Sequence, residues 1–175
     1  MSVLLVGLEP GLGEPLIARL TAQDDEVRVV EADSGRAAHW RELGAYVALG
    51  DGADGDLIER AAQNVRTIVV FQGGEDLDLA VAAALEGASL AGVGRIVVCA
   101  QAVPGPVLDR LRAADIDYVA LSTGGRRRLF ASRTLPDSAL TAAVDAADDL
   151  AAPQRLELDL TRSDAWSALG LEPPE

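Results

Sequence analysis

Short apolar runs alternate with amphipathic segments along most of the chain. Runs rich in Val, Ile and Leu predict strands at residues 2–6, 26–31, 46–49, 67–71, 95–99 and 116–121. Apolar residues at helical spacing predict helices after residue 13 and at residues 34–43, 54–62, 75–90 and 106–114. Continuously apolar strands favour a parallel sheet that is covered on both faces. The pattern therefore predicts an α/β fold, a doubly wound and mostly parallel Rossmann-like sheet with helices on both faces.

The last third of the chain continues the pattern less regularly. A helix is predicted at residues 135–150, and residues 154–160 alternate between apolar and polar in the way of an exposed edge strand. A short helical turn and a frayed end are expected in the last residues. At 175 residues the chain has the length of a single domain. We predict a Rossmann-like dinucleotide-binding domain at residues 1–162 and a C-terminal tail at residues 163–175.

The first strand leads into a glycine-rich turn with Gly7, Gly11 and Gly13. Glycines are needed where such a turn is tight, where backbone N–H groups approach a pyrophosphate, and where the next helix packs closely. The helix N-terminus then faces the anion with unpaired N–H groups and a partial positive charge. Strand, turn and helix together favour a dinucleotide site that includes Gly7, Gly11, Leu12 and Gly13.

Two acidic residues, Glu9 and Glu14, flank this turn. A carboxylate near a helix N-terminus is stabilised by the helix dipole, so that Glu14 in the first turn can take the place of a phosphate. We therefore expect Glu9 and Glu14 to limit the affinity for a cofactor.

The strand at residues 26–31 ends in Glu31, with Asp33 shortly after it. In Rossmann-type domains an acid at this strand end hydrogen-bonds the adenosine ribose hydroxyls. Glu31 is the better candidate and Asp33 the second, while the alternative is that both are solvated loop carboxylates. Arg36 is able to pair with a 2′-phosphate, but the acid at the strand end opposes one. NAD is thus favoured over NADP.

The rare residue types exclude several kinds of chemistry. All 15 basic residues are arginines, which excludes Schiff-base lysines, a Walker lysine and a Tyr-Lys catalytic pair. Cys99 is the one cysteine and His39 the one histidine, so neither a disulfide framework nor a His/Cys zinc site can form, and no metal site is expected. An all-carboxylate metal site is not excluded. His39 is expected at the surface, beside a packing Trp40.

Charge and hydropathy narrow the expected partners. A net charge of −13 repels nucleic acid backbones, and no apolar run reaches the roughly 18 residues of a membrane span. No signal peptide is apparent, so a cytoplasmic protein is expected. The single basic run, Arg126–Arg128, follows a predicted strand, and it is either an anion site or a solvated loop.

Several segments together resemble the atypical, NmrA-like branch of the short-chain dehydrogenase/reductase superfamily over residues 2–160. These segments are the glycine turn, the Leu-Gly-Asp at residues 49–51, the approach to a strand at residues 93–98, and the helix-to-strand passage at residues 111–121. The resemblance implies an NAD(P) cofactor and places Asp51 near the adenine. Gly73, which follows the strand at residues 67–71, completes the set of candidate cofactor-binding residues.

The chain departs from that family at the catalytic residues. Family carbonyl reductases use a serine after the fifth strand and a Tyr-x-x-x-Lys in which the tyrosine is the general acid. Here that strand ends in Cys99 and is followed by Ala100 and Gln101, the chain contains no lysine, and Tyr118 lies inside a predicted strand as a core aromatic. The catalytic residues are therefore unknown.

Two functions from different classes are compatible with the sequence. One is a small NAD(P)-binding protein that acts as a cofactor sensor or as an oxidoreductase that needs no protein acid. The other is a degenerate Rossmann scaffold that serves as a non-catalytic interaction subunit, with homo-oligomerisation as its expected mode.

Overall fold

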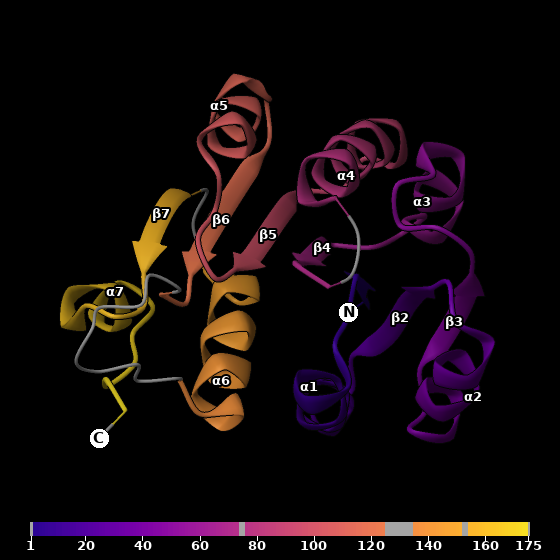
Figure 1. The fold of residues 1–175 in the computed structure, drawn as a ribbon, viewed down its shortest axis with the longest axis horizontal. Coiled ribbons are helices and arrows are strands. Elements are labelled where there is room, and N and C mark those ends of the chain that lie inside the picture. The colour runs from indigo at the N-terminus through magenta and orange to yellow at the C-terminus, as the bar shows by residue number, and fades with distance from the viewer. Residues whose placement is uncertain (1, 74–75, 125–134, 152–153, 175) are drawn as a thin grey trace.

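The computed structural model describes residues 2–73, 76–124, 135–151 and 154–174, and its core is one parallel sheet (Figure 1). The strands are β1 (Ser2–Val6), β2 (Glu26–Glu31), β3 (Tyr46–Leu49), β4 (Thr67–Phe71), β5 (Arg95–Ala100), β6 (Asp117–Ser122) and β7 (Arg155–Asp159). The helices are α1 (Pro10–Ala22), α2 (Ser34–Glu42), α3 (Gly55–Ala61), α4 (Leu77–Ala91), α5 (Gly105–Ala113), α6 (Asp137–Asp148) and α7 (Ser163–Ala168). The first four predicted strands are found with the same bounds, and the other predicted elements apart from α1 have ends displaced by at most two residues.

The seven strands follow the order β3-β2-β1-β4-β5-β6-β7 and all pair in parallel. The chain builds one half of the sheet from β1 outward to β3 and then returns to lay β4 against the other side of β1. Ligands of open α/β sheets bind at such a reversal, outside the carboxyl ends of the strands. The predicted doubly wound fold is confirmed, and β7 is the edge strand that its alternating sequence predicted.

Alternate residues of the central strands face two separate cores. In β1, Val3 and Leu5 pack toward α1, α2, α6 and α7, whereas Leu4 and Val6 pack toward α3, α4 and α5. Figure 1 shows these two groups of helices on opposite faces of the sheet. Because both faces are covered, central strands need apolar residues at every position, and this requirement produced the continuous runs in the sequence.

Helix α7 belongs to the packed structure. Trp166 is 2% exposed and its indole Nε1 donates to the carbonyl oxygen of Leu160 over 2.9 Å. Leu169, just after the helix, is also buried in the core that α6 covers. The short helical turn expected in this segment is present and contributes two large apolar side chains to that core.

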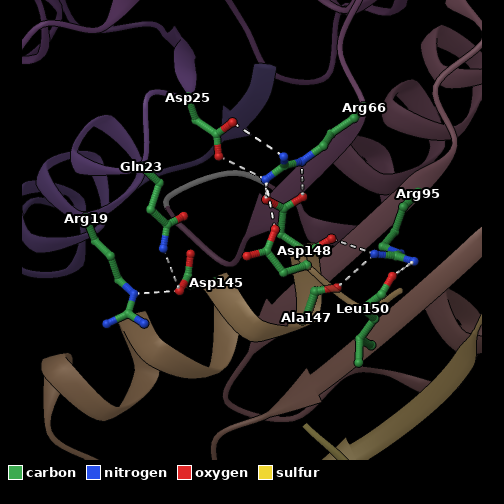
Figure 2. A network of polar contacts seen from close by, with 10 residues as sticks. Arg19, Gln23, Asp25, Arg66, Arg95, Asp145, Ala147, Asp148 and Leu150 are labelled. Carbon is green, nitrogen blue, oxygen red and sulfur yellow. Dashed lines mark hydrogen bonds and ion pairs between the residues drawn. The ribbon is translucent and has the colours of Figure 1, made fainter. Parts of the chain in front are cut away.

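The C-terminal end of α6 is bound to the amino-terminal side of the sheet (Figure 2). Arg66, which precedes β4, donates through Nε to Oδ1 of Asp148 over 3.0 Å and through Nη2 to Oδ2 of Asp25 over 2.9 Å. The side chains of Asp148 and Asp25 are 1% and 5% exposed, so that this arginine neutralises two buried carboxylates at once.

A second arginine caps the same helix end. Arg95, the first residue of β5, donates from its guanidinium to the carbonyl oxygens of Asp148 and Leu150 over 2.5 and 2.8 Å. The last carbonyls of a helix have no partner inside the helix, and they carry the negative end of its dipole. Arg95 thus donates hydrogen bonds to carbonyl groups at this helix end and places a positive charge at the negative end of the helix dipole.

Within the described residues, no helix combines the length and the apolar character that crossing a bilayer requires.

Candidate functional site

The glycine turn after β1 is shaped by backbone contacts with the end of β4. Gly7 has a φ of +69°, and a β-carbon built on it would lie 2.6 Å from the carbonyl oxygen of Phe71. A β-carbon built on Gly73 would lie 2.1 Å from the carbonyl oxygen of Gly7. Both positions therefore require glycine, because the two chain segments meet backbone to backbone at the reversal of strand order.

Gly13 serves helix packing. A β-carbon at this position would lie 2.5 Å from Cη2 of Trp40, whose side chain is fully buried between α1 and the sheet. The predicted buried tryptophan is confirmed, and the neighbouring His39 has the expected exposed side chain.

Glu31 lies at the end of β2 as predicted, but it is buried rather than solvated. Its Oε2 accepts from the Trp40 indole over 3.1 Å, and its Oε1 accepts from the Asp33 amide over 2.9 Å. The same Oε1 lies 2.9 Å from Nη2 of Arg36. Asp33 is exposed and caps α2 by accepting from the Arg36 amide over 2.8 Å, so the solvated-loop interpretation fits Asp33 and not Glu31.

Asp51 lies beyond the end of β3, two strands away from the glycine turn. Its Oδ1 accepts from the Ala53 amide over 2.8 Å, and this bond closes the turn that leads into α3. The amide of Gly50 donates to the carbonyl oxygen of Glu31 over 3.0 Å, which brings the ends of β2 and β3 together. Glu31 and Asp51 therefore lie at the neighbouring carboxyl ends of β2 and β3.

An open pocket of about 440 Å³ occupies the other half of the carboxyl edge of the sheet. It lies between the start of α1, the ends of β4, β5 and β6, and α6, and it is lined by Glu9, Leu12, Phe71, Gln72, Cys99, Ala100, Gln101, Thr123 and Leu140. Leu12 is the one predicted cofactor residue among these lining residues. The pocket lies against the reversal point, where the fold is expected to hold a ligand.

The loops at the pocket are joined to one another by hydrogen bonds. Oε1 of Gln72 accepts from the Gln101 amide over 3.1 Å, and the Gln72 amide donates to the Cys99 carbonyl over 3.0 Å. The Thr123 amide donates to the Ala100 carbonyl over 2.9 Å. Sequence reasoning did not propose Gln72, Gln101 or Thr123 as site residues, although each closely follows a predicted parallel strand, which was the available signal.

The carboxylates of Glu9 and Glu14 lie in different surroundings. Glu9 lines the pocket, whereas Glu14 pairs with Nε2 of His39 over 2.9 Å. The expectation that Glu14 stands in the first turn of the helix was wrong, because α1 begins at Pro10, earlier than its apolar spacing suggested. Proline is well suited to the first position of a helix, where no N–H is needed.

Cys99 forms part of the apolar floor of the pocket and is 4% exposed. Burial raises the pKa of its thiol to about 12, and the negative charge of Glu9 adds to the rise. A protonated thiol is a poor nucleophile, so Cys99 contributes surface rather than covalent chemistry.

Tyr118 is a core residue, as predicted. It is 3% exposed, lies near the beginning of β6, and donates its hydroxyl to Oε1 of Glu157 over 3.1 Å. Burial and the bond to this carboxylate raise the pKa of Tyr118. The phenol is therefore at the opposite end of its strand from the pocket.

The sequence also raised the questions of a metal site and of an anion site at the arginine run. Among the residues that the structure describes, no group of three or more His, Cys, Asp and Glu side chains could hold a metal ion. The Arg126–Arg128 run lies outside the described residues.

Residues 3–122, which contain the glycine turn and strands β1 to β6, match the model of the TrkA-N domain family. The chain belongs to the TrkA-N domain family. No curated protein matches the sequence of this TrkA-N domain.

Solved structures with the same fold include several reductases. ChuY, an anaerobilin reductase from Escherichia coli O157:H7, superposes with a TM-score of 0.74 at 16% identity, over 91% of this chain and 96% of that one. The Citrobacter sp. triphenylmethane reductase, complexed with NADP(H), has a TM-score of 0.70 at 15% identity, over 90% and 69%. The NADPH-dependent quinone oxidoreductase QOR2 from Escherichia coli, complexed with NADPH, has a TM-score of 0.72 at 15% identity, over 89% and 67%.

At such low identity these likenesses show the fold alone. This TrkA-N domain has the NAD(P)-binding Rossmann fold that these reductases share, and the predicted fold is confirmed.

Proposed function

We propose that this TrkA-N domain binds an NAD(P) dinucleotide along the carboxyl edge of its sheet. The observation that carries the proposal is the pocket at the reversal point, which opens directly beside the glycine turn and the start of α1. In this arrangement the pyrophosphate contacts the turn at Gly11 and Leu12, and the adenosine half extends toward Glu31 and Asp51. The nicotinamide half then enters the pocket above β4, β5 and β6.

The charges at the end of β2 favour NAD over NADP in this proposal. The guanidinium of Arg36 lies there and already pairs with the buried carboxylate of Glu31. A 2′-phosphate would therefore meet a neutralised pair instead of an available cation, while ribose hydroxyls can donate to the carboxylate.

The pocket supports hydride transfer without a protein acid, or binding alone. No tyrosine, histidine or lysine belongs to its described lining, and its buried thiol is protonated. The similar structures include proteins named as reductases, and a quinone oxidoreductase among them. A cofactor sensor or an acid-independent oxidoreductase therefore fits the residues present.

Calorimetric titration with NAD⁺, NADH, NADP⁺ and NADPH tests the proposal. Gly11→Val is the informative variant, because a β-carbon there meets nothing closer than 3.5 Å and the added methyl groups would occupy the path of the pyrophosphate. Gly105→Val is the matched control, since this glycine also lies at a helix start and has open space around it. We expect dinucleotide binding to be lost in Gly11→Val and kept in Gly105→Val.

The preference for NAD has its own test within the same titrations. Replacing Glu31 by alanine should weaken NAD and narrow its advantage over NADP, because the ribose hydroxyls lose their acceptor. A preference of the wild type for NADP would refute this part of the proposal. If the folded wild-type protein binds no dinucleotide at millimolar concentration, the Rossmann fold serves another purpose here.

The alternative function is that of a non-catalytic interaction subunit, and one observation favours it. The edge strand β3 exposes Tyr46 and Leu49 to 67% and 54%, which is unusual for large apolar residues of a central sheet. Exposed apolar residues on an edge strand are suited to pairing with another chain. Light scattering of the wild type and of Tyr46→Lys tests whether this edge mediates self-association, since the added charge would dissociate a dimer formed there.

A further inference from the structure

The first residue of α6, Asp137, directs its carboxylate at the glycine turn. A β-carbon built on Gly11 would lie 3.5 Å from Oδ2 of Asp137. A phosphate group placed on that side of Gly11 would therefore lie close to a negative oxygen. Because the proposed site relies on this turn for its pyrophosphate, Asp137 opposes negative charge at that position.

Glu9 places a second carboxylate at the same end of α1. It is the residue that precedes the helix, it lines the pocket, and its Cγ lies 3.4 Å from a β-carbon built on Gly73. Its side chain makes no capping hydrogen bond to the described helix. The charge of Glu9 is felt at the floor of the pocket, where it contributes to the raised pKa of the Cys99 thiol.

The start of α1 offers few amides to offset these charges. Pro10 at the first helical position has no N–H. The amides of Leu12 and Gly13 both donate to the carbonyl oxygen of Glu9, over 3.2 and 2.8 Å. The anion-attracting end of this helix thus lacks the N–H group of its first residue and is faced by two carboxylates.

Helix α6 cannot readily carry Asp137 away, because its other end is fixed. Arg66 and Arg95 bind the last turn of α6 to the amino-terminal side of β4 and β5, as Figure 2 shows. Arg19 of α1 adds a bond to Asp145 over 2.6 Å, which ties the two helices together. These contacts hold α6 against α1 and keep its first residue beside the glycine turn.

We infer that Glu9 makes this site select its dinucleotide by charge, so that the oxidised form binds more tightly than the reduced form, while Asp137 weakens the binding of both forms. The inference rests on the proposed dinucleotide binding. The oxidised nicotinamide ring carries a positive charge and the reduced ring is neutral. Since the nicotinamide half lies above β4, β5 and β6 in the proposed arrangement, the ring enters the pocket that Glu9 lines, while Asp137 acts on the pyrophosphate.

The two carboxylates should give separable effects on the dissociation constants of NAD⁺ and NADH. Asp137→Asn is expected to tighten both ligands by a similar factor, because both carry the same pyrophosphate. Glu9→Gln is expected to tighten NADH more than NAD⁺, because attraction for the oxidised ring is lost together with repulsion of the phosphates. One unit charge at this range in a partly desolvated site corresponds to roughly a three- to tenfold change in Kd.

Glu14→Gln supplies the matched control. Glu14 is on the same helix, but its carboxylate pairs with His39 on α2. Calorimetry on the wild type and the three variants, at low and at high salt, should show both gains shrinking as salt rises and no change for Glu14→Gln. Thermal unfolding of each variant establishes that the differences do not come from the fold.

The outcomes separate the two proposals. If the wild type binds NAD⁺ and NADH equally, or if Glu9→Gln leaves their ratio unchanged, selection by charge is refuted while dinucleotide binding stands. If the folded wild type and the Glu9→Gln/Asp137→Asn double variant bind neither ligand at millimolar concentration, the proposed function fails and the inference fails with it.

Discussion

At the scale of single residues, the glycine turn is dominated by its protein neighbours. Gly7 and Gly73 have no room for a β-carbon because they contact each other's chain segments, and Gly13 has none because of Trp40. The indole of Trp40 is held in turn by its bond to Glu31 at the end of β2. The glycines that are typical of a nucleotide-binding turn are thus also required for the packing of α1 against α2 and β4.

Gly13→Ala should destabilise the protein by about 1 to 3 kcal/mol, the usual cost of overpacking a filled core. The added methyl group would lie 2.5 Å from an indole that is fully buried and hydrogen-bonded, so the indole cannot yield. Urea denaturation measures the change. Gly105→Ala is the control, and it should be neutral or slightly stabilising, because nothing lies within 4 Å of its β-carbon.

Cys99 should react slowly with iodoacetamide while the protein is folded. Its pKa of about 12, against an ordinary value of 9.0, means about a thousandfold less thiolate at pH 8. Because ionisation is disfavoured only in the folded state, the labelling rate should keep rising with pH well above 9. Labelling at the same rate in buffer and in urea would show that the thiol is neither buried nor perturbed.

At the scale of elements, α6 links the two ends of the sheet. Its first residue faces the glycine turn and its last turn is bound by Arg66 and Arg95. The acidic residues Asp145 and Asp148 in that last turn are unfavourable for the helix dipole, so they require the arginines that reach them from α1 and from the segment before β4.

Arg66→Met should cost about 3 to 5 kcal/mol of unfolding free energy, because buried carboxylates lose their counter-charge. Asp148 and Asp25 are the acids that lose the charge of Arg66, and their side chains are 1% and 5% exposed. Arg162→Met is the control, since Arg162 pairs with Asp164 where both side chains are about two-thirds exposed, and such pairs contribute little. Equal effects of the two substitutions in urea denaturation would contradict the role assigned to Arg66.

At the scale of the whole molecule, the chemistry of the chain is limited by its composition. It contains no lysine, and its two tyrosines are the buried Tyr118 at the far end of β6 and the exposed Tyr46 on the β3 edge. Neither phenol is near the pocket that the ends of β4, β5 and β6 form.

We therefore expect no reduction of simple ketones by NADH or NADPH beyond the rate without protein. Tyr118→Phe and Tyr46→Phe should leave any measured turnover unchanged, since neither residue can act as a general acid at the pocket. Steady-state assays that follow the loss of absorbance at the reduced nicotinamide test this. A ketone reductase activity that disappears in either variant would contradict the arrangement described above.

The architecture could be predicted from local features of the sequence. Continuous apolar runs separated by amphipathic segments specify parallel strands that are covered on both faces. The predicted elements lie close to their observed positions because the periodicity of apolar residues that marks each element is a local property of the sequence. The sequence also shows directly that the chain contains no lysine. The burial of Tyr118 could be predicted because this residue lies inside an apolar run.

The candidate site was decided by tertiary structure. Which carboxylate faces the glycine turn depends on where α1 begins and on how α6 packs against it, and Asp137 is more than a hundred residues away from Gly11 along the chain. Glu14 was misplaced because apolar spacing locates a helix face but not its first residue. The pocket itself exists only where loops after three parallel strands converge, and strand order is set by long-range packing that no local pattern records.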